Sequence, residues 1–81
     1  MSEQARLLRQ YGLRVTQART CVLRLLQQEG SLPVAELGER LAQQGIWLGR
    51  PTLDGVLRRF GSVGLLARLE REAADRQVVG G

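Results

Sequence analysis

The sequence predicts a mainly α-helical fold with a small β-hairpin wing, that is, a winged helix-turn-helix. Three observations predict this class. Residues 17–28 carry apolar side chains at the spacing of one helix face. Two further helical patterns, over 34–44 and 51–63, are joined by about six residues, a link compatible with a helix-turn-helix. In 65–70, Leu65, Ala67 and Leu69 alternate with Leu66, Arg68 and Glu70, which is the period of a strand.

The first two helices are predicted over 3–10 and 17–28. Ser2 and Thr16 are the candidate N-caps, because a hydroxyl oxygen accepts a hydrogen bond from an N–H group of the first helical turn. Glycine commonly follows the last residue of a helix. The glycines expected to end the four helices are Gly12, Gly30, Gly45 and Gly64.

The third and fourth helices are predicted over 34–44 and 51–63. Pro33 and Pro51 suit their starts, where the missing N–H of proline costs nothing. Leu32, just before the third helix, is a candidate for a very short strand. The fourth helix presents an apolar stripe that is expected to be buried: Leu53, Val56, Leu57, Phe60 and Val63.

The wing is predicted as one hairpin over 65–79. Leu65, Ala67 and Leu69 alternate with Leu66, Arg68 and Glu70, and a second strand is expected at about 76–79. The loop between the strands, near 73–75, contains no strong turn dipeptide, so its geometry is left open.

The charge of the chain is positive and uneven. The 81 residues allow one small domain of net charge +4, and every basic residue is an arginine. Residues 1–24 hold five arginines against Glu3, a net +4, and residues 50–59 hold three against Asp54, a net +2. Two basic blocks favour a polyanionic partner such as nucleic acid, although a positive charge also serves solubility.

Several classes of protein are disfavoured by what the sequence lacks. Without histidine, a catalytic triad or a phosphate-cradling glycine loop, we expect no enzyme and no catalytic residue. With one cysteine and no histidine, neither a metal site, a cofactor nor a disulfide is expected, and Cys21 is expected to be a small buried hydrophobe. No apolar run approaches the ~20 residues of a membrane span, and no signal peptide is evident, so a cytoplasmic location without membrane contact is expected.

Two segments resemble the ferric-uptake-regulator (Fur) family of transcription factors. "YGLRVTQARTCVLRLL" is similar to the opening of that family, and "LGRPTLDGVLRRFGSVGLLARLE" is similar to its recognition helix and wing. The resemblance runs over about 5–79. The matching positions are Gly12, Leu13, Arg14, Thr16, Arg19, Val22, Leu23, Leu26, Gly49, Thr52, Leu57, Phe60, Gly64 and Leu65.

The resemblance implies a DNA-binding domain of a dimeric, metal-sensing regulator. The histidine-rich sites and CxxC pairs of that family's second domain are absent, so metal sensing does not carry over. The chain is either a fragment of a longer regulator or a stand-alone domain. By resemblance, Arg14 reaches the minor groove, Arg19 lies near the phosphate backbone, and Thr52 contacts a phosphate or a base. The alternatives are solvated surface for both arginines and a local bond to the helix terminus for Thr52.

The fourth helix departs from the family at its outer face. The family's Tyr-Arg pair is Asp54-Gly55 here, and Gly55 offers no side chain. Asp54 is expected to pair with Arg58 at i,i+4 and to interact favourably with the dipole of the first turn; accepting from cytosine is an alternative. Arg50 and Arg59 are expected to contact phosphates. The full set of candidate DNA-contacting residues is Arg14, Arg19, Arg50, Thr52, Asp54, Arg58 and Arg59.

The sequence is compatible with two functions. The first is the DNA-binding domain of a Fur-like transcriptional regulator, which binds duplex DNA weakly and in a salt-dependent way when alone. The second is a winged-helix module for dimerisation or for docking on a partner regulator, without specific DNA reading. Trp47 is expected to pack beside the fourth helix; an exposed contact with a partner is the alternative.

Overall fold

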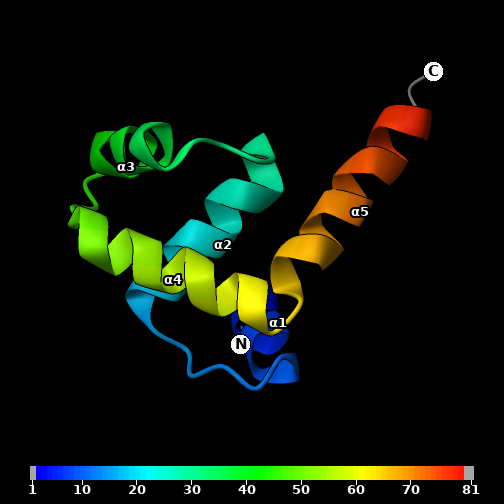
Figure 1. Ribbon diagram of the computed structural model, residues 1–81, viewed down its shortest axis with the longest axis horizontal. Helices are drawn as coiled ribbons and strands as arrows, with labels where there is room; N and C mark the ends of the chain where they lie inside the picture. Colours follow the sequence, from blue (N-terminus) through cyan, green and yellow to red (C-terminus); the bar gives the residue numbers. More distant parts are fainter. Residues whose placement is uncertain (1, 80–81) are drawn as a thin grey trace.

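The structure is a computed structural model that describes residues 2–79, and the side chains of residues 2–75. Its described part contains five helices and no strand (Figure 1). The helices are α1 (Glu3–Gln10), α2 (Gln17–Glu29), α3 (Val34–Gln43), α4 (Arg50–Ser62) and α5 (Leu65–Val79). The predictions of the first four helices are confirmed, with no end displaced by more than one residue. Leu32 lies in a loop, so the short strand predicted there is wrong.

The helix ends follow the predicted local chemistry. The Ser2 hydroxyl accepts a hydrogen bond from the Ala5 N–H at 3.1 Å, and the Thr16 hydroxyl accepts one from the Arg19 N–H at 3.1 Å. Gly64, between α4 and α5, has a φ of +88°, a conformation that residues with a Cβ rarely adopt. The other predicted helix-ending glycines also have positive φ: Gly12, Gly30 and Gly45.

Helix α2 is the centre of the fold, since it contacts α1, α3, α4 and α5. Its five buried residues are Cys21, Val22, Leu23, Leu25 and Leu26, so the expectation of a buried Cys21 is confirmed. Leu37 and Leu41 of α3 and Phe60 of α4 are fully buried against this helix and its neighbours. The three helices α2, α3 and α4 therefore share one core.

Helices α3 and α4 approach each other closely at Gly38. A Cβ placed on this glycine would lie 3.3 Å from Cδ1 of Leu53, which is tighter than most real contacts. The link between the two helices, residues 44–49, is held to the core by the half-buried side chains of Ile46 and Leu48. The Ile46 N–H also donates to the Leu41 carbonyl at 2.9 Å. A short, anchored link thus fixes α4 relative to α3.

The predicted β-hairpin wing is wrong, because residues 65–79 form the single helix α5. The alternation of Leu65, Ala67 and Leu69 was compatible with a strand, but Leu65 and Leu69 are also four residues apart and lie on one helix face, where both are buried. The segment is rich in Leu, Ala, Arg and Glu, which are strong helix formers. With no turn dipeptide to break it, the segment continues as a helix.

The first half of α5 packs against the core through Leu65 and Leu69 and contacts Tyr11 through Arg68. Arg68 forms an ion pair with Glu72 at 3.2 Å, and its guanidinium carbon lies 5.9 Å from the centre of the Tyr11 ring. Hydrogen bonding with Tyr11, and then with Glu72, raises the pKa of Arg68 above its usual value. This arginine is therefore engaged within the fold.

Candidate nucleic-acid interface

Helix α4 has a buried face and an exposed face. Leu53, Val56 and Phe60 are buried, as the apolar stripe predicts, whereas Leu57 and the C-cap residue Val63 are only half-buried. The helix contacts α2, α3 and α5 through this stripe. Its opposite face lies at the surface, and the exposed residues of α4 are Arg50, Pro51, Thr52, Gly55, Arg58, Arg59, Gly61 and Ser62.

Arg58 and Arg59 are the cations of this face that are not neutralised. Both are exposed, and neither forms an ion pair with any acidic group in the described part of the chain. The one hydrogen bond found at Arg59, from the Ser62 hydroxyl at 3.0 Å, goes to its backbone carbonyl and does not involve the guanidinium. Guanidinium groups in water are the donors that phosphate oxygens accept most readily in a forked geometry.

Asp54 pairs with Arg50, not with Arg58, so that prediction is wrong. The Arg50 Nε and the Asp54 Oδ1 lie 3.3 Å apart, one helical turn from each other. The predicted helix began at residue 51, which left Arg50 outside it; the observed helix begins at Arg50, and this places a cation four residues before the carboxylate. Asp54 is also beyond the first turn, which contains no acidic residue, so the expected dipole interaction is wrong too.

Thr52 is exposed near the start of α4. The N-cap of this helix is Gly49, and no side chain caps it. The local hydrogen bond that was one alternative for the Thr52 hydroxyl is not among the bonds found within residues 2–75. Thr52 is thus an exposed residue whose hydroxyl is not used to cap α4.

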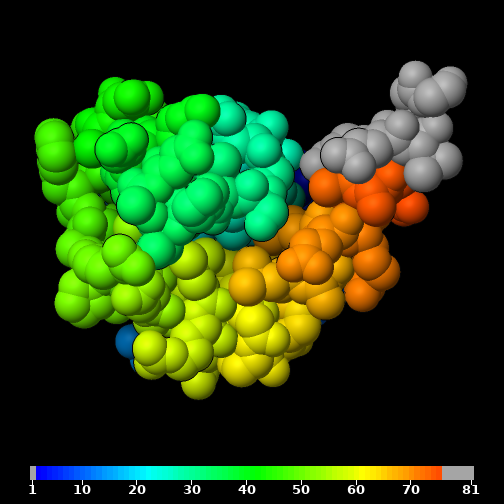
Figure 2. All heavy atoms as spheres, turned by 45° about the horizontal axis from the view of Figure 1, so that its top comes forward, coloured from blue at the N-terminus to red at the C-terminus, as the bar shows by residue number. Residues whose placement is uncertain are grey.

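Arg14 lies in the loop before α2 and Arg19 in the first turn of α2, and the two are not equivalent. The Arg14 side chain is exposed. Arg19 is half-buried, and its Nη1 donates to the Arg14 carbonyl at 3.0 Å. Arg19 thus supports the loop that carries Arg14. In Figures 1 and 2 this loop comes to the surface beside α4.

Trp47 was expected to pack beside α4, and this is wrong. Its side chain is 80% exposed, while its neighbours Ile46 and Leu48 are half-buried. The helical period that identified the buried stripe of α4 gives no information about a loop residue, and so the sequence alone could not place this indole. Its position is two residues before the N-cap Gly49.

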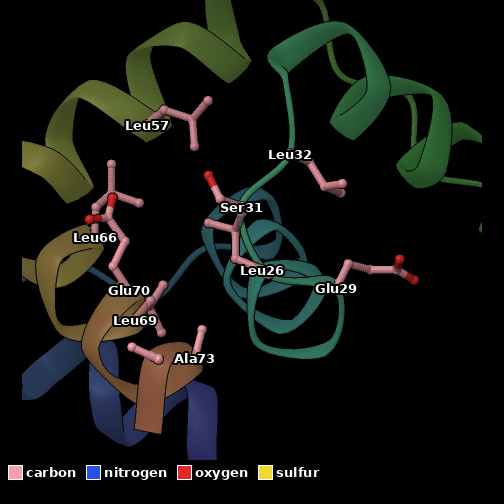
Figure 3. Close-up of a pocket in the computed structure, with 11 residues that line it drawn as sticks. Leu26, Glu29, Ser31, Leu32, Leu57, Leu66, Leu69, Glu70 and Ala73 are labelled. Atoms are coloured by element: carbon pink, nitrogen blue, oxygen red, sulfur yellow. The ribbon is translucent and has the colours of Figure 1, made fainter. Parts of the chain in front are cut away.

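A second surface feature is an apolar groove, which the sequence did not indicate. It lies between the C-terminal end of α2, the loop after it, α4 and α5, and its volume is about 540 Å³. Figure 3 shows Leu57, Leu66, Leu69 and Ala73 converging on it from α4 and α5, with Leu26 opposite. In Figure 2 the hollow separates the α2–α3 segment from α5. Residues from three separate parts of the chain form it, namely 26–32, Leu57 and 66–74, so its existence depends on the fold.

Neither a metal cluster nor a membrane span is found in the described part of the chain. No three or more Cys, Asp or Glu side chains gather there in a way that would hold a metal ion. No described helix has the length and apolar character needed to cross a bilayer. Comparisons of the chain with protein-family models, with curated proteins and with solved structures find no match.

Proposed function

We propose that this chain is a helix-turn-helix DNA-binding domain of a transcriptional regulator, with α4 as its recognition helix. The observation that carries the proposal is the exposed face of α4, which has two unpaired arginines and is backed by a buried stripe on α2 and α3. A recognition helix needs this combination, because one face must be fixed to the domain while the other enters the major groove.

The charge distribution supports the same partner. Arg58 and Arg59 on α4 and Arg14 in the loop before α2 are exposed cations with no ion pair among the described residues. Each can neutralise a phosphate and release a counterion, which gives affinity that falls as salt rises. Arg14 at the edge of this surface also suits a narrow minor groove, where the potential is most negative.

Specific reading of bases by this helix is expected to be limited. Asp54 repels phosphates and neutralises Arg50, and Gly55 has no side chain that can reach a base. A bidentate base contact contributes roughly 1–3 kcal/mol of discrimination, and neither Asp54 nor Gly55 has a side chain that can donate to a base. We therefore propose weak binding with little preference between sequences when the domain acts alone.

A titration of labelled duplex DNA at low salt, followed by fluorescence anisotropy, tests the proposal. The expected dissociation constant is micromolar or weaker, and log K should fall linearly with log salt. Arg58→Ala and Arg59→Ala should each reduce that slope by about 1. Arg24→Ala is the matched control: Arg24 is exposed on α2 and lines a separate hollow with Glu3, Glu72 and Asp75. Absence of binding at low salt would contradict the proposal.

The apolar groove favours a second candidate function, self-association. One wall of the groove is α5 itself, which contributes Leu66, Leu69 and Ala73. A two-fold axis beside α5 would bring the same wall of two copies together, so a single surface would serve both partners.

Sedimentation equilibrium tests this second candidate. The wild-type chain should show a concentration-dependent increase in mass, and Ala73→Glu should reduce it, because the added carboxylate would lose water when a second copy covers the groove. Ala67→Glu is the control, since Ala67 is exposed on the same helix and does not line the groove. A chain that stays monomeric at all concentrations, or an equal effect of both substitutions, argues against self-association through α5.

A further inference from the structure

Trp47 is held in an exposed position by a well-anchored loop. Ile46 before it and Leu48 after it both pack against the core. The loop is also tied by backbone hydrogen bonds, from the Ile46 N–H to the Leu41 carbonyl at 2.9 Å and from the Leu53 N–H to the Gly49 carbonyl at 3.0 Å. The indole, 80% exposed, is the large apolar side chain left in water among the described residues. Its exposure therefore follows from a fixed backbone.

The position of Trp47 places it at the end of α4 that faces DNA in a helix-turn-helix complex. It lies two residues before the N-cap Gly49 and three before Arg50, the first residue of α4. In such complexes the N-terminal residues of the recognition helix contact base edges, so the loop that precedes them reaches the rim of the groove. The rim consists of sugars and phosphates.

The chemistry around Trp47 suits that rim. Between Arg40 and Asp54 the only charged residue is Arg50, so no carboxylate adjoins the indole along the chain. An indole offers a flat apolar face, which packs on deoxyribose or on a thymine methyl group, and one N–H that donates to a phosphate oxygen. An exposed indole thus matches the rim of a duplex better than it matches water.

We propose that Trp47 is a DNA-contacting residue, whose indole packs on the sugar–phosphate rim of the groove entered by α4. This inference rests on the proposed DNA-binding function. It adds an apolar, sequence-tolerant contact to a surface whose other contacts are ionic. The contact should therefore strengthen binding without adding to the number of phosphates neutralised.

Because Trp47 is the only tryptophan in the chain, its own fluorescence reports on the contact. DNA binding is followed separately by the anisotropy of a labelled duplex. On saturation, the Trp47 emission should shift to the blue or be quenched, and acrylamide should quench it less than in the free protein. Trp47→Ala should weaken binding at least about fivefold, Trp47→Phe by less, and the salt slope should stay unchanged in both. The melting temperature of Trp47→Ala verifies that the variant is folded.

Each outcome distinguishes the two proposals. If the duplex binds but the emission and quenching of Trp47 do not change, the role of Trp47 is overturned while DNA binding stands. If the duplex does not bind at low salt, the proposed function fails and this inference fails with it. If Trp47 becomes protected on concentrating the protein without DNA, the indole belongs to a contact between copies, and its role toward DNA is likewise overturned.

Discussion

Asp54 lowers the positive charge of the exposed face of α4 through its ion pair with Arg50. Its carboxylate lies 3.3 Å from Arg50, in the order with the cation first, which is the less favourable one on a helix. Both side chains are well exposed, so the pair contributes no more than a few tenths of a kcal/mol to stability, roughly 0.2–0.5. Its larger consequence is electrostatic, because it neutralises a cation at the start of α4.

Replacing Asp54 by asparagine should therefore tighten DNA binding. Asp54→Asn keeps the size of the side chain, removes a negative charge near the phosphates and frees Arg50. We expect a few-fold lower dissociation constant at low salt, measured by anisotropy, with the melting temperature nearly unchanged. The control is Asp75→Asn, the same substitution at an exposed position of α5. Equal effects of both variants would show that only the net charge matters.

Gly55 and Gly38 both lie inside helices, yet they should respond differently to alanine. A Cβ at Gly55 meets no atom within 4 Å, whereas one at Gly38 lies 3.3 Å from Leu53 Cδ1. Gly55→Ala should stabilise the fold by about 0.5–1 kcal/mol, which raises the melting temperature by a few degrees. Gly38→Ala should give a smaller gain or a loss. Thermal unfolding followed by circular dichroism compares them, and a larger gain at Gly38 would contradict the packing of α3 on α4.

At the scale of elements, four helices could be predicted and the fifth could not. The helices over 3–10 and 17–28 have hydroxyl caps, and each of the first four ends near a glycine that adopts a positive φ, so local sequence was sufficient. In 65–79, a five-residue alternation fits both a strand and a helix. Composition then decides, since Ala, Leu, Arg and Glu favour a helix. Helix propensity summed over the whole segment therefore predicts the helix that is observed, rather than a hairpin.

A proline in α5 distinguishes the two structures directly. Ala74 is exposed within the helix, but the predicted hairpin would have had its loop there. Ala74→Pro should cost about 3 kcal/mol by removing a helical hydrogen bond, and the helical signal at 222 nm and the melting temperature should both fall. Ala74→Ser, a mild change at the same position, should have little effect. A proline variant with unchanged helicity would be evidence against α5.

At the scale of the whole molecule, the exposed arginines of α4 were predictable and their surroundings were not. The helical period alone put Arg58 and the buried stripe on opposite faces of α4. The exposure of Trp47, the partner of Asp54 and the apolar groove depend on where α4 begins and on how separate segments of the chain meet. Such features arise from tertiary packing, which no local pattern encodes.

The surface of the folded domain is thus divided between an arginine-bearing face on α4 and an apolar groove beside α5. DNA is proposed to bind the first, and a second copy the second. The two surfaces are built from different residues, apart from α4 contributing Leu57 to the groove. A method that follows every backbone amide at once therefore separates the two roles.

Mapping of amide chemical shifts during a titration with duplex DNA tests the central claim most directly. Binding through the exposed face of α4 predicts shifts concentrated at Arg14, at Trp47 and along residues 49–62, lost progressively as salt is added. Amides lining the groove from α5, at Leu66 and Ala73, should move little. Shifts centred on the groove with α4 unchanged, or no shifts at low salt, would contradict the account.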